Sequence, residues 1–141
     1  MPFNWSKPTT QLLGRYQPWH DGHTKLFEKA LEKTGQVVIM LRTTEQDDSN
    51  PFDIETRVMQ IVEKLSEAGY TTDVFTIISV PNIEHITYGR DVGYKIEQEH
   101  LGAEVENISA TKIREQMKNE NKCCMCKLGY KIWYFLHSQT L

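Results

Sequence analysis

The fold is decided by the stretch Gly14-Arg-Tyr-Gln-Pro-Trp-His-Asp-Gly-His23, which joins a strand pattern to a helix pattern. Residues 9–16 read as a short strand, and residues 22–33 repeat apolar side chains at helical spacing. The stretch therefore places a glycine-containing turn at the carboxyl end of a strand, where parallel α/β proteins bind their ligands.

The alternation of strand and helix continues along the chain. Gly35 is expected to end the first helix, Asp53 to cap a second one that Gly69 ends, and Ser109 to cap the last. Further strands are expected at residues 36–42 and 73–80, with shorter ones at 86–88 and 94–96. This order predicts a parallel α/β sheet with right-handed crossovers.

Composition limits the function classes. The chain has 141 residues and a mass of 16.4 kDa, the size of one domain. Its net charge of −3 argues against a nucleic-acid binder that rests on a basic face. No apolar run approaches the roughly 20 residues of a membrane span, and the first residues lack a secretion signal. We therefore expect a cytoplasmic protein with neither nucleic acid nor membrane as partner.

Charge divides the chain. Residues 1–117 carry 12 basic and 18 acidic side chains, whereas residues 118–141 carry four lysines and one glutamate. We accordingly expect an N-terminal arm at 1–8, one domain at 9–117 and a basic, cysteine-containing segment at 118–141. That segment could be a peripheral element, a docking segment or an oligomer contact, so the sequence leaves a homo-oligomer open.

All three cysteines lie in this last segment, at Cys123, Cys124 and Cys126. A clustered, odd set is a poor disulfide framework and indicates a reducing compartment. A metal-binding redox protein that uses these cysteines with His137 is an alternative, but the usual two-residue spacer is missing. We expect no resident metal.

Two histidines follow the first strand, separated by a glycine at a helix start. The first-turn amides of a helix lack partners, and the helix dipole adds partial positive charge, so both favour a phosphate. Gly14 and Gly22 allow close approach to the backbone, and the imidazoles of His20 and His23 can donate to phosphoryl oxygens. By themselves, the histidines could equally mark a surface helix start or two ligands of a metal.

A second constellation lies at residues 108–114, Ile-Ser-Ala-Thr-Lys-Ile-Arg. Ser109 and Thr111 bring hydroxyls to a helix N-terminus, and Arg114 brings a planar fork suited to two phosphate oxygens. Alone, this is a capped helix with a solvated arginine. Together with the histidine motif, it can enclose a triphosphate.

The two motifs resemble the signatures of the HxGH nucleotidyltransferase superfamily, over roughly residues 9–117. The version GRYQPWHDGH, with NPFDIETR at residues 50–57, is most similar to the archaeal-type nicotinamide-mononucleotide adenylyltransferases. The resemblance implies a Rossmann-like parallel sheet with helices on both faces. It also implies transfer of AMP from ATP to a phosphate-bearing small acceptor such as nicotinamide mononucleotide, with release of pyrophosphate.

The resemblance also implies roles for individual residues. His20 and His23 would bind the α- and β-phosphates, and Arg114 would hold the β- and γ-phosphates and the leaving pyrophosphate. Trp19 and Arg57 would bind the acceptor. Further nucleotide contacts would come from Gly14, Arg15, Tyr16, Gly22, Gly89, Arg90, Asp91, Ser109 and Thr111. Mg²⁺ would be held mainly by the triphosphate and water.

Two departures from the family bear on the substrates. The segment 81–87 is shorter than the one that holds the acceptor ring in nicotinamide-handling members. Tyr16-Gln17 stands where small cytidylyltransferases usually carry Phe-Asp, which favours adenylyl transfer. The alternatives are a CTP-dependent cytidylyltransferase acting on a phosphorylated alcohol and a non-catalytic nucleotide-binding module.

Overall fold

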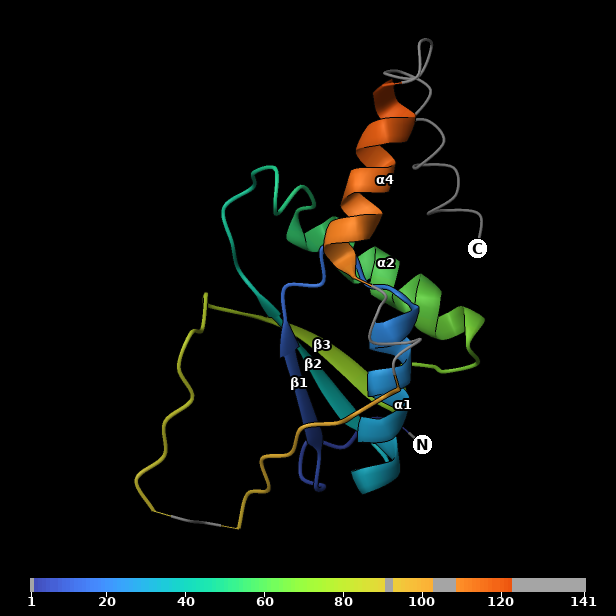
Figure 1. The fold of residues 1–141 in the computed structure, drawn as a ribbon. Helices are drawn as coiled ribbons and strands as arrows, with labels where there is room; N and C mark the ends of the chain where they lie inside the picture. The colour runs from blue at the N-terminus through green and yellow to red at the C-terminus, as the bar shows by residue number, and fades with distance from the viewer. Residues whose placement is uncertain (1, 91–92, 103–108, 123–141) are drawn as a thin grey trace.

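The computed structural model describes residues 2–90, 93–102 and 109–122. Its centre is a parallel three-stranded sheet in the order β1-β2-β3. The strands are β1 (Thr10–Gly14), β2 (Val37–Arg42) and β3 (Phe75–Val80), and the described helices are α1 (Asp21–Thr34), α2 (Ile54–Glu67) and α4 (Ala110–Lys122). Figure 1 shows α4 beyond the carboxyl ends of the strands, above the start of α1.

The first helix, predicted at residues 22–33, extends one residue further at each end. His20 is the N-cap of α1, and Gly35 is its C-cap with a left-handed φ of 83°. The amide of Gly35 donates to the carbonyl of Leu31 at 2.8 Å, which closes the last turn. A glycine is favoured here because a side chain would strain this backbone conformation.

The second helix is also capped as predicted. Asp53 Oδ1 accepts a hydrogen bond from the amide of Thr56 at 2.8 Å. The helix ends at Glu67, and Gly69 follows with a left-handed φ of 94°. Both predicted crossovers are therefore helical, and they join strands that run in parallel.

Strand β1 ends at Gly14, two residues earlier than predicted. Tyr16 adopts a left-handed φ of 52°, and the carbonyl of Arg15 accepts a hydrogen bond from the buried guanidinium of Arg57 at 2.8 Å. The backbone therefore leaves the extended conformation as soon as the glycine is passed.

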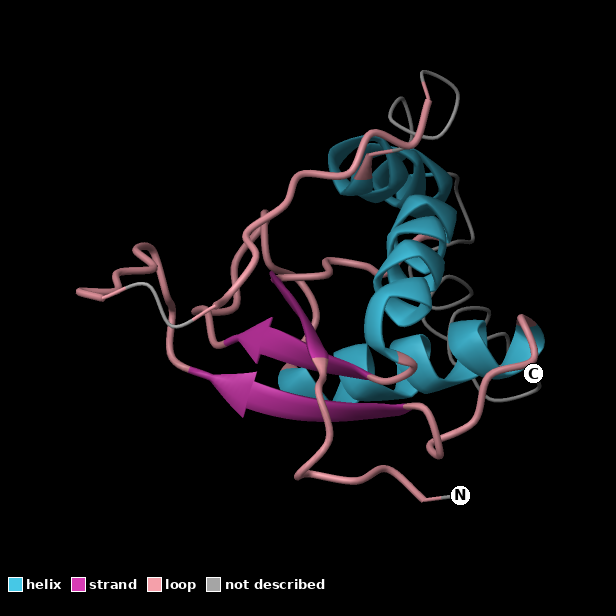
Figure 2. Ribbon diagram, turned by 90° about the horizontal axis from the view of Figure 1, so that it is seen from below, coloured by secondary structure: helices cyan, strands magenta, loops and turns pink. Residues whose placement is uncertain are grey.

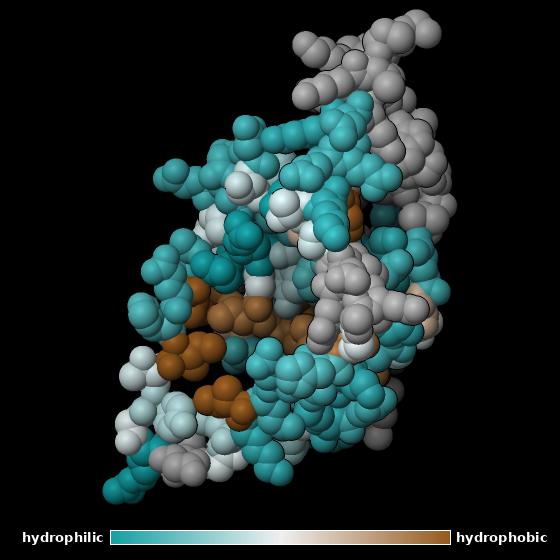
Figure 3. Space-filling model, viewed as in Figure 1, coloured by the Kyte–Doolittle hydropathy of each residue, from teal (hydrophilic) through white to brown (hydrophobic). Residues whose placement is uncertain are grey.

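One face of the sheet is covered by both α1 and α2. Residues of β2 alternate between buried and half-buried, and the buried ones share a core with Phe27 of α1 and Ile61 of α2. Figure 2 shows the described helices on one side of the strands. The other face, with Val38, Met40 and Ile78, is half-buried, and Figure 3 shows apolar residues over this part of the sheet. The Rossmann-like parallel sheet is confirmed. Helices were expected on both faces, but the described helices lie on one, because the strand order β1-β2-β3 with two right-handed crossovers places α1 and α2 on the same side.

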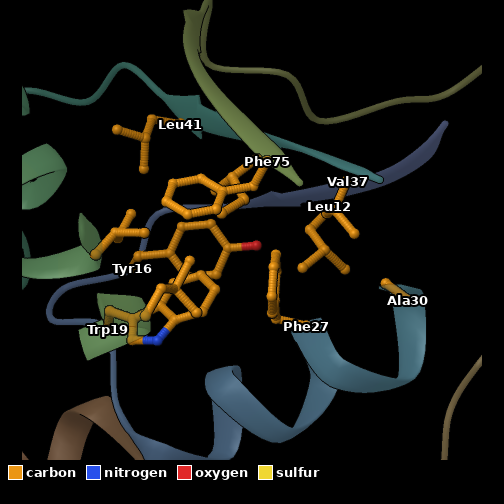
Figure 4. Packing of buried hydrophobic residues seen from close by; sticks show 11 residues of the cluster. Leu12, Tyr16, Trp19, Phe27, Ala30, Val37, Leu41 and Phe75 are labelled. Atoms are coloured by element: carbon orange, nitrogen blue, oxygen red, sulfur yellow. The ribbon is translucent and has the colours of Figure 1, made fainter. Parts of the chain in front are cut away.

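The core extends from the sheet into the loop between β1 and α1. Figure 4 shows Tyr16 and Trp19 of this loop packed near Phe27 and Phe75. The ring centroids of Phe27 and Phe75 are 5.9 Å apart, at an interplanar angle of 90°. The buried apolar cluster consists of Leu12, Tyr16, Trp19, Phe27, Ala30, Val37, Ile39, Leu41, Ile61, Leu65 and Phe75. The loop that carries the histidines is thus anchored in the core.

The two short strands predicted after β3 are wrong. Residues 86–88 and 94–96 are irregular, and their large apolar side chains are exposed, at 66% for Ile86 and 69% for Ile96. A strand is stable only when a neighbouring strand takes its backbone hydrogen bonds and its apolar side chains are covered. Among the described residues no strand pairs with these two stretches, and their apolar side chains are exposed.

Gln36 attaches the N-terminal arm to the start of β2. It is only 6% exposed, and its Nε2 donates to the carbonyl of Asn4 at 2.6 Å and to Thr9 Oγ1 at 2.7 Å. Its Oε1 accepts from the amide of Asn4 at 3.2 Å. The arm is therefore packed against the sheet through one buried amide side chain.

Candidate functional site

Three segments meet at the carboxyl ends of β1 and β2. They are the loop 15–20 with the start of α1, the loop 43–53 before α2, and the N-terminal turn of α4 (Figure 1). This edge of a parallel sheet is where ligands bind in open α/β folds. The two sequence motifs, about 90 residues apart in the chain, both lie here.

His20 and His23 form a capping box at the start of α1, in which each side chain accepts a hydrogen bond from the backbone amide of the other residue. The amide of His20 donates to Nδ1 of His23 at 3.1 Å, and the amide of His23 donates to Nδ1 of His20 at 3.4 Å. Their rings are stacked, with centroids 3.7 Å apart. Because each Nδ1 accepts a hydrogen bond, each neutral ring carries its proton on Nε2. The capping arrangement therefore leaves both rings with an Nε2–H donor.

Burial keeps these rings neutral. It lowers the pKa of His23 to about 3, an effect to which the nearby His20 adds. Burial likewise lowers the pKa of His20, against the opposing influence of Asp21. At neutral pH both side chains are therefore hydrogen-bond donors without charge, and the positive charge of the site comes from arginines.

The low pKa of His23 predicts a pH-dependent stability. Below about pH 6.5 the unfolded chain binds a proton on His23 that the folded protein excludes, so the free energy of unfolding falls as the pH drops. From pH 7 to pH 5, wild type should lose about 2 kcal/mol more than His23→Gln, which retains a capping acceptor. Urea unfolding at pH 7, 6 and 5 checks this, and parallel curves for the two proteins would contradict it.

Arg114 joins the second motif to the first. Its Nη1 donates to the carbonyl of Gln17 at 2.6 Å, and its Nη2 donates to Thr111 Oγ1 at 3.2 Å. Ser109 caps α4, as predicted, by accepting from the amide of Lys112 at 3.1 Å. The structure therefore brings Ser109, Thr111 and Arg114 to the loop that carries the histidines.

Arg15 brings a second guanidinium to the same place. Its Nη1 donates to Asn50 Oδ1 at 3.2 Å. Desolvation lowers the pKa of Arg114, and repulsion from Arg15 lowers it further, whereas Asp47 acts in the opposite direction. Two arginines near each other on a polar loop form a site suited to a multiply charged anion.

The aromatic rings of Tyr16 and Trp19 pack against the ring of His23. Trp19 is 2% exposed, and its Nε1 donates to Thr24 Oγ1 at 2.9 Å. The rings of Tyr16 and His23 meet edge to face with centroids 4.8 Å apart. Gly14 is needed for this packing, because a Cβ there would lie 2.9 Å from Tyr16 Cζ. Both aromatic rings therefore pack in the core, and Trp19, which was expected to contact the acceptor, has almost no exposed surface for it.

Arg57 is buried beneath the site, at 1% exposure. Its Nη1 donates to the carbonyls of Arg15 at 2.8 Å and of Arg42 at 3.0 Å. It ties the end of β1 to the end of β2. It also lines a cavity of about 420 Å³ together with Thr44, Gln46, Phe52, Asp53, Ile54 and Glu55.

Replacing Arg57 with methionine should destabilise the protein by about 3 kcal/mol, because two buried carbonyls lose their donor. Arg90→Met is the matched control, since Arg90 is exposed. Urea unfolding of both variants checks this expectation. A loss of about 0.5 kcal/mol or less, the range of ordinary surface substitutions, would show that Arg57 does not brace the strand ends.

The structure does not bring the predicted contacts at 89–91 to the site. Gly89 and Arg90 are exposed, in the loop that Figure 1 shows extending away from the sheet on the side opposite α1. Asp91 lies outside the described residues. Gly22 does lie in the site, buried in the first turn of α1.

Sequence reasoning missed three polar residues that shape the site. Gln17 is 2% exposed, and it exchanges two hydrogen bonds of 3.0 Å with the backbone of Phe52. Asn50 and Asp47 lie in the loop between β2 and α2, where Asn50 Nδ2 donates to Asp47 Oδ1 at 3.0 Å. Asn50 directly precedes Pro51 in the NPFDIETR stretch, and this position was the one available signal for it.

Within the described ranges, no group of three or more His, Cys, Asp or Glu side chains is placed to hold a metal ion. Among the described helices, none has the length and apolarity to cross a bilayer. Residues 118–122 of the basic segment expected at 118–141 continue α4, so no boundary separates residues 117 and 118, and the three cysteines lie outside the described residues.

Comparisons with known proteins agree with the geometry. The model of the cytidylyltransferase-like family matches residues 12–77, from β1 into β3. The nicotinamide-nucleotide adenylyltransferase of Caldivirga maquilingensis is 32% identical over 75 residues, 52% of this chain and 42% of that protein. The one from Methanococcus aeolicus is 24% identical over 132 residues, 77% of this chain and 76% of that protein.

A solved structure is similar as well. It is a bifunctional NMN adenylyltransferase/ADP ribose pyrophosphatase from Francisella tularensis, complexed with AMP and a Mn ion. The TM-score is 0.50 at 28% identity, over 53% of this chain and 23% of that one.

Residues 12–77 thus resemble the cytidylyltransferase-like family. Within that class, the predicted resemblance to archaeal nicotinamide-nucleotide adenylyltransferases is confirmed. The chain spans less than half the length of several of these relatives, as the 42% for Caldivirga maquilingensis illustrates.

Proposed function

We propose that the protein transfers AMP from ATP to nicotinamide mononucleotide and releases pyrophosphate. The observation that carries this proposal is the 2.6 Å hydrogen bond from Arg114 Nη1 to the carbonyl of Gln17, which joins the two nucleotidyltransferase motifs in one site. The names of the relatives support adenylyl transfer and this acceptor.

The chemistry needs no covalent intermediate. A phosphate oxygen of the acceptor attacks the α-phosphorus of ATP in line, the bond to the β-phosphate oxygen breaks, and pyrophosphate leaves. His20 and His23 donate from Nε2 to the phosphoryl oxygens as charge develops in the transition state. Because both rings are neutral, each contributes one hydrogen bond and no charge of its own.

The arginines hold the leaving group. Arg114 and Arg15 are charged at neutral pH, and each can offer two N–H donors to phosphate oxygens. They would bind the β- and γ-phosphates, with Ser109 and Thr111 beside them. This arrangement orients the α-phosphate toward the histidines, and positioning of this kind lowers the barrier without acid or base catalysis.

Mg²⁺ is proposed to enter with the triphosphate. The donors described here are N–H groups, which complement phosphate oxygens rather than a cation, so triphosphate oxygens and water would supply most of the metal's ligands. The ion would neutralise part of the phosphate charge in the transition state. We also propose a cytoplasmic location, since the three crowded cysteines suit a reducing compartment.

Pyrophosphate release in the presence of Mg²⁺ tests the proposal. ATP and CTP are each offered with nicotinamide mononucleotide, phosphopantetheine, phosphoglycerol or phosphocholine. Release only with ATP and nicotinamide mononucleotide is expected. Release with CTP and a phosphorylated alcohol would move the protein to cytidylyl transfer, and binding of nucleotide without release would indicate a non-catalytic module.

A further inference from the structure

Asn50 is a buried polar residue outside both nucleotidyltransferase motifs. It is 8% exposed, and both ends of its side-chain amide are used. Its Oδ1 accepts from Arg15 Nη1 at 3.2 Å, and its Nδ2 donates to Asp47 Oδ1 at 3.0 Å. These two bonds fix the orientation of the amide, so that its acceptor faces the arginine.

The turn at residues 47–50 holds Asn50 in place. Asp47 Oδ1 also accepts from the amides of Ser49 and Asn50, both at 2.8 Å. In addition, the backbones of Asp47 and Asn50 exchange two hydrogen bonds of 3.1 Å. A turn with this many internal bonds keeps its geometry without help from a ligand.

The same turn balances the charge of two arginines. Hydrogen bonds from the side chain of Asn50 and from the amides of Asn50 and Ser49 lower the pKa of Asp47, and Arg15 lowers it further, so its carboxylate stays ionised. Asp47 also interacts favourably with Arg114, whose charge Arg15 disfavours. Nζ of Lys118 in α4 lies 3.9 Å from Oδ2 of Asp48, so an exposed ion pair also joins the turn to the helix that carries Arg114.

We propose that Asn50 is a positioning residue for the anion site: through the turn 47–50 it holds the Arg15 guanidinium beside Arg114 before a polyphosphate binds. Without Asn50, Arg15 would move away from Arg114, because their charges repel. The inference rests on the proposed function only for the identity of the anion, since any polyphosphate would use the two arginines.

A double-mutant cycle on the full chain tests this role. Binding of inorganic tripolyphosphate is measured by calorimetry for wild type, Asn50→Leu, Arg15→Ala and the double variant. Asn50→Leu should weaken binding about tenfold when Arg15 is present, since a charge-assisted hydrogen bond orients the arginine. In the Arg15→Ala background, the same change should alter binding less than about twofold. Ser49→Ala is the control, because it keeps the backbone turn.

Thermal unfolding of each variant separates positioning from stability. A purely structural role would weaken binding equally with and without Arg15, and that result would overturn the inference. Failure of wild type to bind tripolyphosphate would overturn it as well. If Asn50→Leu does not fold, Asn50→Ser replaces it in the cycle. Tripolyphosphate binding that follows the cycle without any nucleotidyl transfer would support the inference and reject the proposed function.

Discussion

Replacing His23 with alanine lowers the rate of nucleotidyl transfer by about 10²–10³, because one preorganised donor to the developing phosphoryl charge is lost. The ring of His23 is buried and neutral, and its Nδ1 is occupied by the amide of His20. The side chain therefore contributes one hydrogen-bond donor to the transition state, Nε2–H, since Nδ1 is used in the capping box. Steady-state pyrophosphate release at saturating ATP measures the loss.

His85→Ala is the matched control, since His85 is exposed in the loop after β3. It should retain wild-type activity. Circular dichroism of His23→Ala verifies that the fold survives the loss of one capping bond, which costs only about 1 kcal/mol. A loss of activity below about tenfold in a folded variant would remove His23 from the proposed transition-state contacts.

Replacing Arg114 with alanine lowers kcat/KM for ATP by about 10²-fold or more, because the leaving pyrophosphate loses the two N–H donors of the guanidinium. The substitution also removes the hydrogen bond from α4 to the carbonyl of Gln17. Arg114→Lys should recover less than about tenfold of this loss, since an ammonium cannot make two parallel bonds to phosphate oxygens. Initial rates over a range of ATP concentrations give both numbers.

Lys118→Ala controls for the loss of a positive charge on the same helix. Lys118 lies one turn further along α4, and its pair with Asp48 is exposed at 3.9 Å. Such a pair contributes at most about 1 kcal/mol, so kcat/KM should change little. Equal losses in Arg114→Ala and Lys118→Ala would mean that net charge, and not the Arg114 fork, governs ATP use.

The parts of the fold that sequence predicts well are those that neighbouring residues decide. Asp53 caps α2 through an amide three residues away, and Gly35 ends α1 through a carbonyl four residues back. The apolar run before Arg42 becomes the central strand because it must be buried on at least one face. Such signals are local, and the structure confirms them.

Long-range packing decides the rest. Arg57 looks like a residue of an amphipathic helix, yet its partners are the carbonyls of Arg15 and Arg42, 42 and 15 residues away in the chain. Trp19 follows a proline in a motif loop, and only the packing of α1 against β1 shows that its ring is in the core. The strand predicted at 86–88 is absent for the same reason, since no described strand pairs with these residues.

The candidate site shows the same division. The resemblance predicted that the histidine motif and the serine-threonine-arginine motif would share one site, and the hydrogen bond between Arg114 and the carbonyl of Gln17 joins them. Asn50 could not be predicted, because its role depends on how the loop before α2 folds onto Arg15. A polar loop residue acquires such a role only through its tertiary neighbours.

The most direct test of the central claim is to follow the α-phosphate of ATP itself. The protein is incubated with Mg²⁺, nicotinamide mononucleotide and ATP labelled in its α-phosphate, and the products are separated and weighed by mass spectrometry. Label is expected in a dinucleotide of AMP and nicotinamide mononucleotide, with one pyrophosphate per product, and His23→Ala should lose this activity. Label that remains in ATP, or that appears only in free AMP, would contradict it.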